Sequence, residues 1–312
     1  HGTAEAALAA LPRYADHPGR FIIPCPHDGA RRELDALHKL GAQLLHLDHP
    51  GYPPLLALTE DPPPLLAILG DASVLLRRQV AVVGARAASA AGQRVAEELA
   101  AGLTTAGLAV TSGLARGIDA AAHRGALNAH GRTIACVAGG LDQPYPPENI
   151  PLQARIAAEG GAVVAEMPLG TQPLGRHFPR RNRVIAGLSL GVVVVEAAQK
   201  SGSLMTARLA LEAGREVYAA PGSPLDPRAR GSNDLIRQGA HITESAEDVI
   251  THLPPAPRDQ PLFRPAPPAP EPVPDSPPPP PDAGSEVLDL IGLTPVAVDD
   301  LVRRCHLPAP TV

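Results

Sequence analysis

Aromatic residues make up only 2% of this 312-residue chain, and tryptophan is absent. An aromatic side chain that lies among charges is therefore more informative here than in an average sequence. The three cysteines, Cys25, Cys136 and Cys305, lie far apart and form no CxxC pair. This pattern excludes a disulfide framework and a cysteine-ligated zinc site, and it predicts a reducing, cytoplasmic compartment. The twelve histidines show no metal-ligand spacing, so we expect no metal.

Long hydrophobic runs are also missing. No run of about 18 or more apolar residues is present, which excludes an ordinary transmembrane helix, and no basic-then-apolar leader points to secretion. Hydrophobic residues still make up 44% of the chain, enough for a core. The net charge of -5 argues against a nucleic-acid ligand. However, the excess of acidic residues lies towards the two ends of the chain. Because salt screens distant charges, the charge near the binding site decides whether a polyanion binds.

Short β-branched runs alternate with amphipathic, helix-length stretches from Val80 onward. The run 192–195 is apolar at every position, which is typical of a strand buried on both faces. A helix is expected from about Ser89 to Ala106, with Ser89 as its N-cap. Strands separated by helices predict an α/β fold with a doubly wound, mostly parallel sheet. The expected strands are 80–83, 108–111, 133–138, 162–166, 191–196 and 216–220.

The remaining segments differ in composition. Residues 1–70 have a helical stretch near 31–40 and two proline-rich turns, which indicates a small helical domain, whole or partial. Residues 71–253 form the main domain. Residues 254–285 are dominated by proline and are expected to be an extended linker. Residues 286–312 predict two short helices, the incomplete start of a winged-helix-like unit.

The first unusual loop, Gly84-Ala85-Arg86, follows the strand 80–83. In doubly wound sheets, ligands bind outside the carboxyl ends of the strands. Gly84 permits a close backbone approach there, and Arg86 supplies a fork of hydrogen-bond donors. The loop lacks the GxGxxG pattern of dinucleotide sites, so we expect no cofactor. The alternative is an ordinary turn with a surface arginine.

The second loop runs from Ser112 to Asp119 and opens a helix. Its glycines, its unpaired amides and the helix dipole predict an anion cradle, to which the Ser112 hydroxyl adds a donor. The alternative is a tight turn in which Asp119 caps the helix. Asp119 and His123 lie four residues apart, which is more typical of a local salt bridge than of catalysis. The anion-binding candidates are Ser112, Gly113, Arg116 and Gly117.

The third loop begins at Gly175 and sets Phe178 in a basic cluster that no acid interrupts. Arginines on phosphates, with one ring on which a base stacks, suit single-stranded nucleic acid. The alternative is a solvated basic helix start with Phe178 in the core. The candidates of this loop are Arg176, Phe178, Arg180, Arg181, Asn182 and Arg183.

The fourth loop follows the most apolar strand and contains Lys200, Ser201, Gly202 and Ser203. It predicts a phosphate-shaped nest at a helix start. No GxSxG elbow is present, so we expect no serine nucleophile. The four loops together offer anion donors but no catalytic pair, which favours a binding protein and a ligand with repeated phosphates.

Several motifs resemble the DNA-processing protein A (DprA/Smf) family over about residues 50–250. They occur in the family's order and comprise Val82 to Arg86, Ser112 to Asp119 with His123, Gly139 to Asp142 with Tyr145-Pro146, Phe178 to Ser189, Glu196-Ala197 with Ser201 to Ser203 and Thr206, and Pro221-Gly222. Where some members carry a lysine three positions before the aromatic, this chain has Gly175, with Arg176 as the nearest substitute.

The resemblance implies an extended Rossmann fold with a sterile-alpha-motif-like N-terminal domain and a winged-helix-like C-terminal domain. It implies a homodimer that binds single-stranded DNA without sequence preference, protects it and helps to load RecA recombinase during natural transformation. The implied contacts fall on Arg86, on Ser112 to Gly117 and on Phe178. The alternative is a Rossmann-fold enzyme resembling nucleotide phosphoribohydrolases, in which a catalytic Glu follows a glycine-rich loop. Here Leu141-Asp142 follows Gly139-Gly140 instead.

Overall fold

The computed structural model describes residues 25–254, together with residues 6 and 8. The predicted linker beyond Pro254 and the predicted winged-helix start at 286–312 lie outside the described residues. Cys305 and most of the chain before Cys25 also lie outside them.

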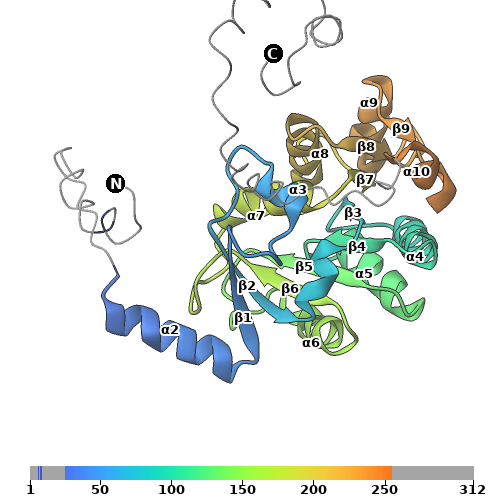
Figure 1. Cartoon of the computed structure of the whole chain (residues 1–312). Helices are drawn as coiled ribbons and strands as arrows, with labels where there is room; N and C mark the ends of the chain where they lie inside the picture. Colours follow the sequence, from blue (N-terminus) through green and yellow to red (C-terminus); the bar gives the residue numbers. More distant parts are fainter. Residues whose placement is uncertain (1–5, 7, 9–24, 255–312) are drawn as a thin grey trace, which may run out of the picture. The chain divides into compact units, whose positions relative to one another are not determined.

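Within the described residues, nine strands form one sheet in the order β1-β2-β6-β5-β4-β3-β7-β8-β9 (Figure 1). The seven strands β6-β5-β4-β3-β7-β8-β9 pair in parallel. β1 pairs antiparallel with β2, and β2 pairs antiparallel with β6. The six strands predicted from the sequence are all present, and the doubly wound, mostly parallel sheet is confirmed. They are β3 (Gln79–Gly84), β4 (Ala109–Ser112), β5 (Thr133–Val137), β6 (Ala162–Ala165), β7 (Gly191–Val195) and β8 (Glu216–Ala219).

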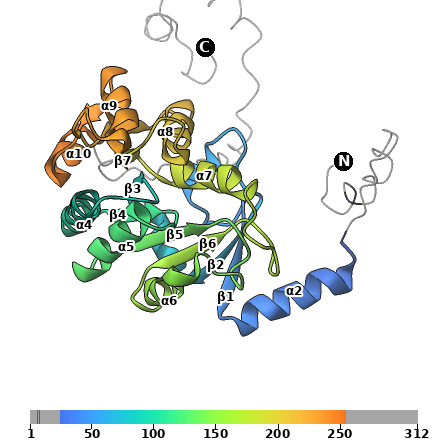
Figure 2. The ribbon, with the colours of Figure 1, turned by 180° about the vertical axis from the view of Figure 1, so that it is seen from behind.

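Helices cover both faces of the sheet (Figures 1 and 2). In β3, Ala81 and Val83 pack with one face, and Val80 and Val82 pack with the other, so the strand is buried on both sides. The first face is covered by α3 (Pro54–Ala57), α7 (His177–Leu188) and α8 (Gly202–Glu212). The second face is covered by α4 (Ala90–Thr105), α5 (Ile118–Asn128), α6 (Ile150–Ala158) and α10 (Ala246–His252). As predicted, Ser89 caps α4 by accepting a hydrogen bond from the Gly92 amide.

The sheet extends further towards the N-terminus than the sequence indicated. β1 (Ala42–His46) and β2 (Leu65–Gly70) belong to it, although residues 1–70 were predicted to form a helical domain. β2 pairs directly with β6, and Leu66 and Ile68 are fully buried. The sequence analysis missed these two strands because proline-rich turns lie beside them, and proline in a segment normally argues against a strand. Of the predicted N-terminal domain, α2 (His27–Lys39) is helical; it begins four residues before the predicted stretch and ends one residue before its end.

A short strand, a helix and three 3-10 turns are the remaining elements between residues 25 and 254. The two-residue strand β9 (His241–Ile242) pairs with β8. The helix α9 (Arg230–Arg237) leads into it. Short 3-10 turns lie at η2 (Ala72–Leu76), η3 (Pro147–Asn149) and η4 (Pro227–Ala229). Short strands of this kind carry too little periodic signal to be predicted from the sequence.

Asp119 and His123 do not form the salt bridge expected from their spacing. The Asp119 carboxylate accepts hydrogen bonds from the amides of Gly113 (3.1 Å) and Ala115 (3.4 Å). The His123 ring is fully buried, and its Nδ1 lies 2.7 Å from the Thr133 hydroxyl. Because that hydroxyl donates to the Val110 carbonyl (2.7 Å), Nδ1 must be the donor to Thr133. His123 therefore acts as a neutral core residue.

Burial of His123 makes folding dependent on pH. The pKa of His123 is lowered from 6.5 to about 3, mainly because burial desolvates the ring and also because the charges of Arg181 and Arg124 oppose protonation. The unfolded chain therefore binds one more proton than the folded chain between these values, and stability falls as the pH drops below about 6.5. One such proton contributes a slope of up to about 1.4 kcal/mol per pH unit.

We expect urea denaturation at a series of pH values from 7 to 4.5 to show this loss in the wild-type chain. His123→Asn keeps a donor for Thr133 but cannot be protonated, so its stability should change less over the same range. Equal slopes for the two chains would show that His123 does not carry the effect.

Candidate nucleic-acid interface

A groove of about 860 Å³ lies where the carboxyl ends of β3 and β7 meet. β3 pairs with β4 on one side and with β7 on the other, so the order of connection reverses between β3 and β7. Ligands of doubly wound sheets bind at such switch points. The loop after β3 and the loop from β7 to α8 both line the groove, together with the first turn of α7.

Two glycines hold the Arg86 loop in place by close backbone contacts. A Cβ atom on Gly84 would lie 1.8 Å from the Val195 carbonyl oxygen, so the ends of β3 and β7 meet without an intervening side chain. Gly117 has a φ of +72°, and its Cβ would lie 2.3 Å from the Ala85 carbonyl oxygen. The same carbonyl accepts the Ile118 amide at 3.2 Å. The start of α5 therefore fixes the backbone that presents Arg86.

Arg86 and Phe178 come together in the groove. Arg86 is exposed, and its guanidinium carbon lies 4.9 Å from the centre of the Phe178 ring. The Phe178 ring is partly exposed rather than buried in the core, and it lines the groove. Stacking of this cation on the ring stabilises the pair and keeps both groups at the groove surface.

Arg181 forms part of the groove floor. Its side chain is only 7% exposed, and it donates hydrogen bonds to the carbonyl oxygens of Gly113 (2.6 Å) and Cys136 and to Oδ1 of Asn182 (3.2 Å). Burial lowers the pKa of Arg181, and the nearby negative charge of Asp119 opposes this shift. Burial likewise raises the pKa of Asp119, against the attraction of Arg181. The floor thus combines a positive and a negative group.

Other predicted cations are neutralised by acids that lie elsewhere in the sequence. Arg180 and Arg183 both bind Oε1 of Glu166, which follows β6 and has a side chain that is 7% exposed. Arg183 also lies 3.7 Å from Asp61. Arg116 pairs with Glu148 at 2.8 Å. No acid interrupts the basic cluster of the third loop in the sequence, but the fold places acidic side chains from other segments beside it.

The start of α8 forms the opposite wall of the groove. Ser201 caps the helix by accepting a hydrogen bond from the Ser203 amide (3.3 Å), and the two hydroxyls lie 2.7 Å apart. Lys200 precedes the cap in a left-handed conformation with a φ of +68° and is exposed. This wall presents a helix N-terminus beside a lysine, an arrangement that suits an anion.

The structure brings only part of the predicted set into the groove. The predicted residues that line it are Arg86, Phe178, Arg181, Asn182, Lys200, Ser201, Gly202 and Ser203. The predicted residues outside the lining are Ser112, Gly113, Arg116, Gly117, Arg176, Arg180 and Arg183. Ser112 is buried, and its hydroxyl donates to the Val82 carbonyl (2.6 Å), so it supports the sheet instead of an anion cradle.

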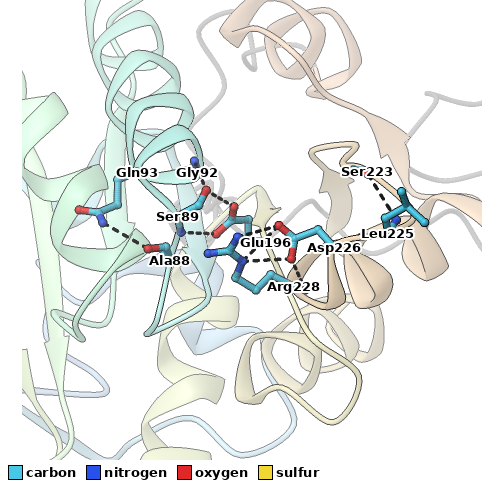
Figure 3. Close-up of polar contacts among 9 residues, drawn as sticks. All are labelled: Ala88, Ser89, Gly92, Gln93, Glu196, Ser223, Leu225, Asp226 and Arg228. Atoms are coloured by element: carbon cyan, nitrogen blue, oxygen red, sulfur yellow. Dashed lines mark hydrogen bonds and ion pairs between the residues drawn. The ribbon is translucent and has the colours of Figure 1, made fainter.

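A set of polar contacts around Arg228, a lining residue of the groove, was not predicted (Figure 3). Glu196, at the end of β7, accepts hydrogen bonds from the amide (2.8 Å) and the hydroxyl of Ser89. Arg228, after β8, lines the groove and donates to both carboxylate oxygens of Asp226 (2.8 and 3.0 Å). The hydrogen bonds to Asp226 and the charge of Glu196 raise the pKa of Arg228. Tyr145 and Met205 are further lining residues that the sequence reasoning missed as site residues.

In the part of the chain that the structure describes, no group of three or more His, Cys, Asp or Glu side chains is arranged to hold a metal ion. The described helices include none that is both long and apolar enough to cross a bilayer.

The fold is that of a Rossmann-like protein, and the groove at its sheet edge is lined by cationic and aromatic side chains. Residues 43–254 match the family model of DNA recombination-mediator protein A. Residues 1–36 match a DprA-like N-terminal HHH domain, and residues 266–312 match a DprA winged helix domain. The chain belongs to the DprA/Smf family, and the resemblance seen in its motifs is confirmed.

Relatives and solved structures agree with this assignment. The chain is 44% identical to Protein Smf of Escherichia coli over 74% of its own length and 62% of that protein's length. It is 43% identical to DNA processing protein DprA of Bacillus subtilis over 72% of the chain and 75% of that protein. The structure matches DprA of Streptococcus pneumoniae with a TM-score of 0.66 at 43% identity, over 69% of this chain and 75% of that one.

A second structure extends the comparison. DprA of Helicobacter pylori, whose single-stranded DNA binding mode has been described, matches with a TM-score of 0.60 at 29% identity. The match covers 67% of this chain and 94% of that one.

Proposed function

We propose that the chain binds single-stranded DNA in the groove, without sequence preference. One observation carries this proposal: the exposed Arg86 guanidinium lies over the Phe178 ring in the same groove as Lys200 and the start of α8. A cationic groove that contains an aromatic ring suits a flexible strand, because the cations contact phosphates and any base can stack on the ring. The similarity to the Helicobacter pylori protein supports this ligand.

The groove residues divide into two roles. Arg86 and Lys200 contact phosphates because both side chains are exposed on the walls of the groove. The amides at the start of α8 contact phosphates as well. Phe178 stacks on a base. Arg181 adds a positive charge at the floor, and the nearby carboxylate of Asp119 partly offsets it. Arg180, Arg183 and Arg116 keep their carboxylate partners and contribute mainly to stability.

This division predicts different effects for two exposed cations. Lys200→Ala should weaken binding of an oligo-dT strand several-fold and reduce the slope of log affinity against log salt by about 0.7, the value for one lost contact to a single strand. Arg180→Ala should leave affinity and slope nearly unchanged, since Glu166 holds that guanidinium away from the ligand. Filter binding between about 50 and 200 mM salt measures both quantities. Equal losses in the two variants would contradict the assignment.

We further propose that the bound strand is protected and passed to RecA recombinase, that the chain acts as a homodimer, and that it serves natural transformation. The support is the family itself, whose model is described as a DNA recombination-mediator protein. Sedimentation of the chain tests the dimer. RecA assembly on an oligo-dT strand, followed with and without the chain, tests loading; an unchanged assembly rate would contradict it.

We propose binding rather than catalysis for this groove. Both oxygens of Asp142, which follows the glycine pair Gly139-Gly140, accept the Gly170 amide (2.8 and 3.0 Å), and Asp142 does not line the groove. A Cβ on Gly139 would lie 2.7 Å from the Thr171 carbonyl oxygen, so the backbone near Thr171 packs against this loop and leaves no room for a substrate there. Incubation with nucleoside monophosphates should release no free base. Release of base would favour the phosphoribohydrolase-like alternative.

A further inference from the structure

The aromatic side chains of the described residues fall into two groups. Tyr52 and Tyr218 are in the core, with exposed fractions of 4% and 0%. Tyr145 and Phe178 are the other two phenylalanine or tyrosine rings in this part of the chain, and both line the groove. Among residues 25–254, the phenylalanine and tyrosine rings that are not in the core therefore both lie at the groove.

Tyr145 and Phe178 form one aromatic corner. Their ring centres are 5.9 Å apart, and their planes are inclined at 66°, an edge-to-face arrangement. Tyr145 reaches this position from the loop after β5, whereas Phe178 belongs to the first turn of α7. Tyr145 is 40% exposed although its side chain is large and apolar. The contact with Phe178 covers only part of the Tyr145 side chain, and the rest is open to a ligand.

The two rings differ in what already covers them. The guanidinium carbons of Arg86 and Arg181 lie 4.9 and 5.7 Å from the centre of the Phe178 ring. Within the described residues, no cation lies over the Tyr145 ring. A base therefore meets an open aromatic surface at Tyr145. At Phe178 it must either displace Arg86 or stack beyond it.

We propose that Tyr145 is a nucleobase-stacking residue of the groove, and that with Phe178 it seats a base of the bound strand. This inference rests on the proposed function and deepens it. The corner orients the strand with its bases towards the two rings and its phosphates towards Arg86 and Lys200. The contact is independent of sequence, because every base has a π-face.

Three variants and two ligands separate stacking from a structural role. Tyr145→Leu removes the ring but keeps an apolar side chain, Tyr145→Phe keeps the ring, and Arg86→Ala reports on the groove itself. The ligands are an oligo-dT strand and an abasic strand of equal length, which has the same phosphates and no bases. Because the chain lacks tryptophan, its tyrosine emission is readable, and a stacked base quenches it.

We expect Tyr145→Leu to lose roughly 5- to 150-fold in affinity for oligo-dT, the effect of one stacked base. Tyr145→Phe should stay close to wild type in affinity but show less quenching. For the abasic strand, wild type and Tyr145→Leu should bind equally, with no quenching.

Wild-type affinity for oligo-dT in Tyr145→Leu, or equal losses with both ligands, would overturn the role of Tyr145. If Arg86→Ala nevertheless weakens binding, the proposed function stands without this inference. If Arg86→Ala binds both strands as the wild type does, the groove itself is not the DNA site.

Discussion

Replacing Arg86 with alanine is expected to weaken binding of single-stranded DNA by about tenfold or more, the effect of losing a hydrogen bond to a charged group. Arg86 is exposed, and no carboxylate among the described residues pairs with it. Its charge is thus available to a phosphate. The slope of log affinity against log salt should fall by about 0.7 for the one lost contact. Filter-binding titrations with oligo-dT at several salt concentrations measure both effects.

Arg116→Ala is the matched control for this experiment. Arg116 is also an exposed arginine in a loop at the carboxyl edge of the sheet, but it pairs with Glu148 and does not line the groove. Its removal changes the net charge by the same amount as the removal of Arg86. If the two variants lose affinity equally, general attraction and not the groove accounts for binding.

Gly84→Ala is expected to destabilise the fold by about 3 kcal/mol, the upper part of the range for overpacking, because the added methyl group meets a rigid backbone contact. The new Cβ would lie 1.8 Å from the Val195 carbonyl oxygen and 2.7 Å from the Ile118 side chain. Separating β3 from β7 to relieve this contact would also displace the Arg86 loop. Urea denaturation should show a lower midpoint, and the folded fraction should bind oligo-dT more weakly.

Gly175→Ala provides the comparison for that variant. Nothing lies within 4 Å of a Cβ built on Gly175, and its φ is not positive. Gly175 lines the same groove as Gly84, so the two variants differ in whether the added methyl group meets a neighbouring atom. Gly175→Ala should retain wild-type stability. A midpoint for Gly84→Ala within error of that variant would mean that the β3–β7 contact can relax without cost.

The parallel sheet was predictable because its strands carry strong local signals. The run Val192 to Val195 is apolar at every position, and Ser89 marks the start of α4. β1 and β2 were not predictable, because their burial depends on antiparallel pairing and not on local periodicity. β1 pairs with β2, and β2 pairs with β6, which lies far away in the sequence. Such long-range pairing overrides the proline-rich context of these strands.

The candidate site was predicted in outline but not in its charges. The sequence places Arg86 and Lys200 in loops that follow strands and Phe178 at the start of a helix. Parallel strands bring such loops and helix starts to one edge of the sheet. Which arginines remain available depends on contacts with distant acids. Glu166 precedes Arg180 by 14 positions, and Glu148 follows Arg116 by 32, so neither pair forms a helical i,i+4 spacing.

Tyr145 illustrates the same limit for aromatic residues. Tyr145-Pro146 belongs to one of the family's motifs, but the loop contains no basic cluster, so the sequence does not mark Tyr145 as a ligand-site residue. Only the fold brings it within 5.9 Å of Phe178. Ser112 shows the reverse case, because a hydroxyl at a strand end looked like an anion donor but bonds to Val82 within the sheet.

Photocrosslinking tests the central claim most directly. An oligo-dT strand that carries 5-iododeoxyuridine should be irradiated with the full chain, and the adduct should be located by mass spectrometry of its peptides. The structure predicts adducts in the groove, on Phe178 or Tyr145, that disappear when unlabelled oligo-dT competes. Adducts confined to residues outside the groove, with none on either ring, would contradict the account.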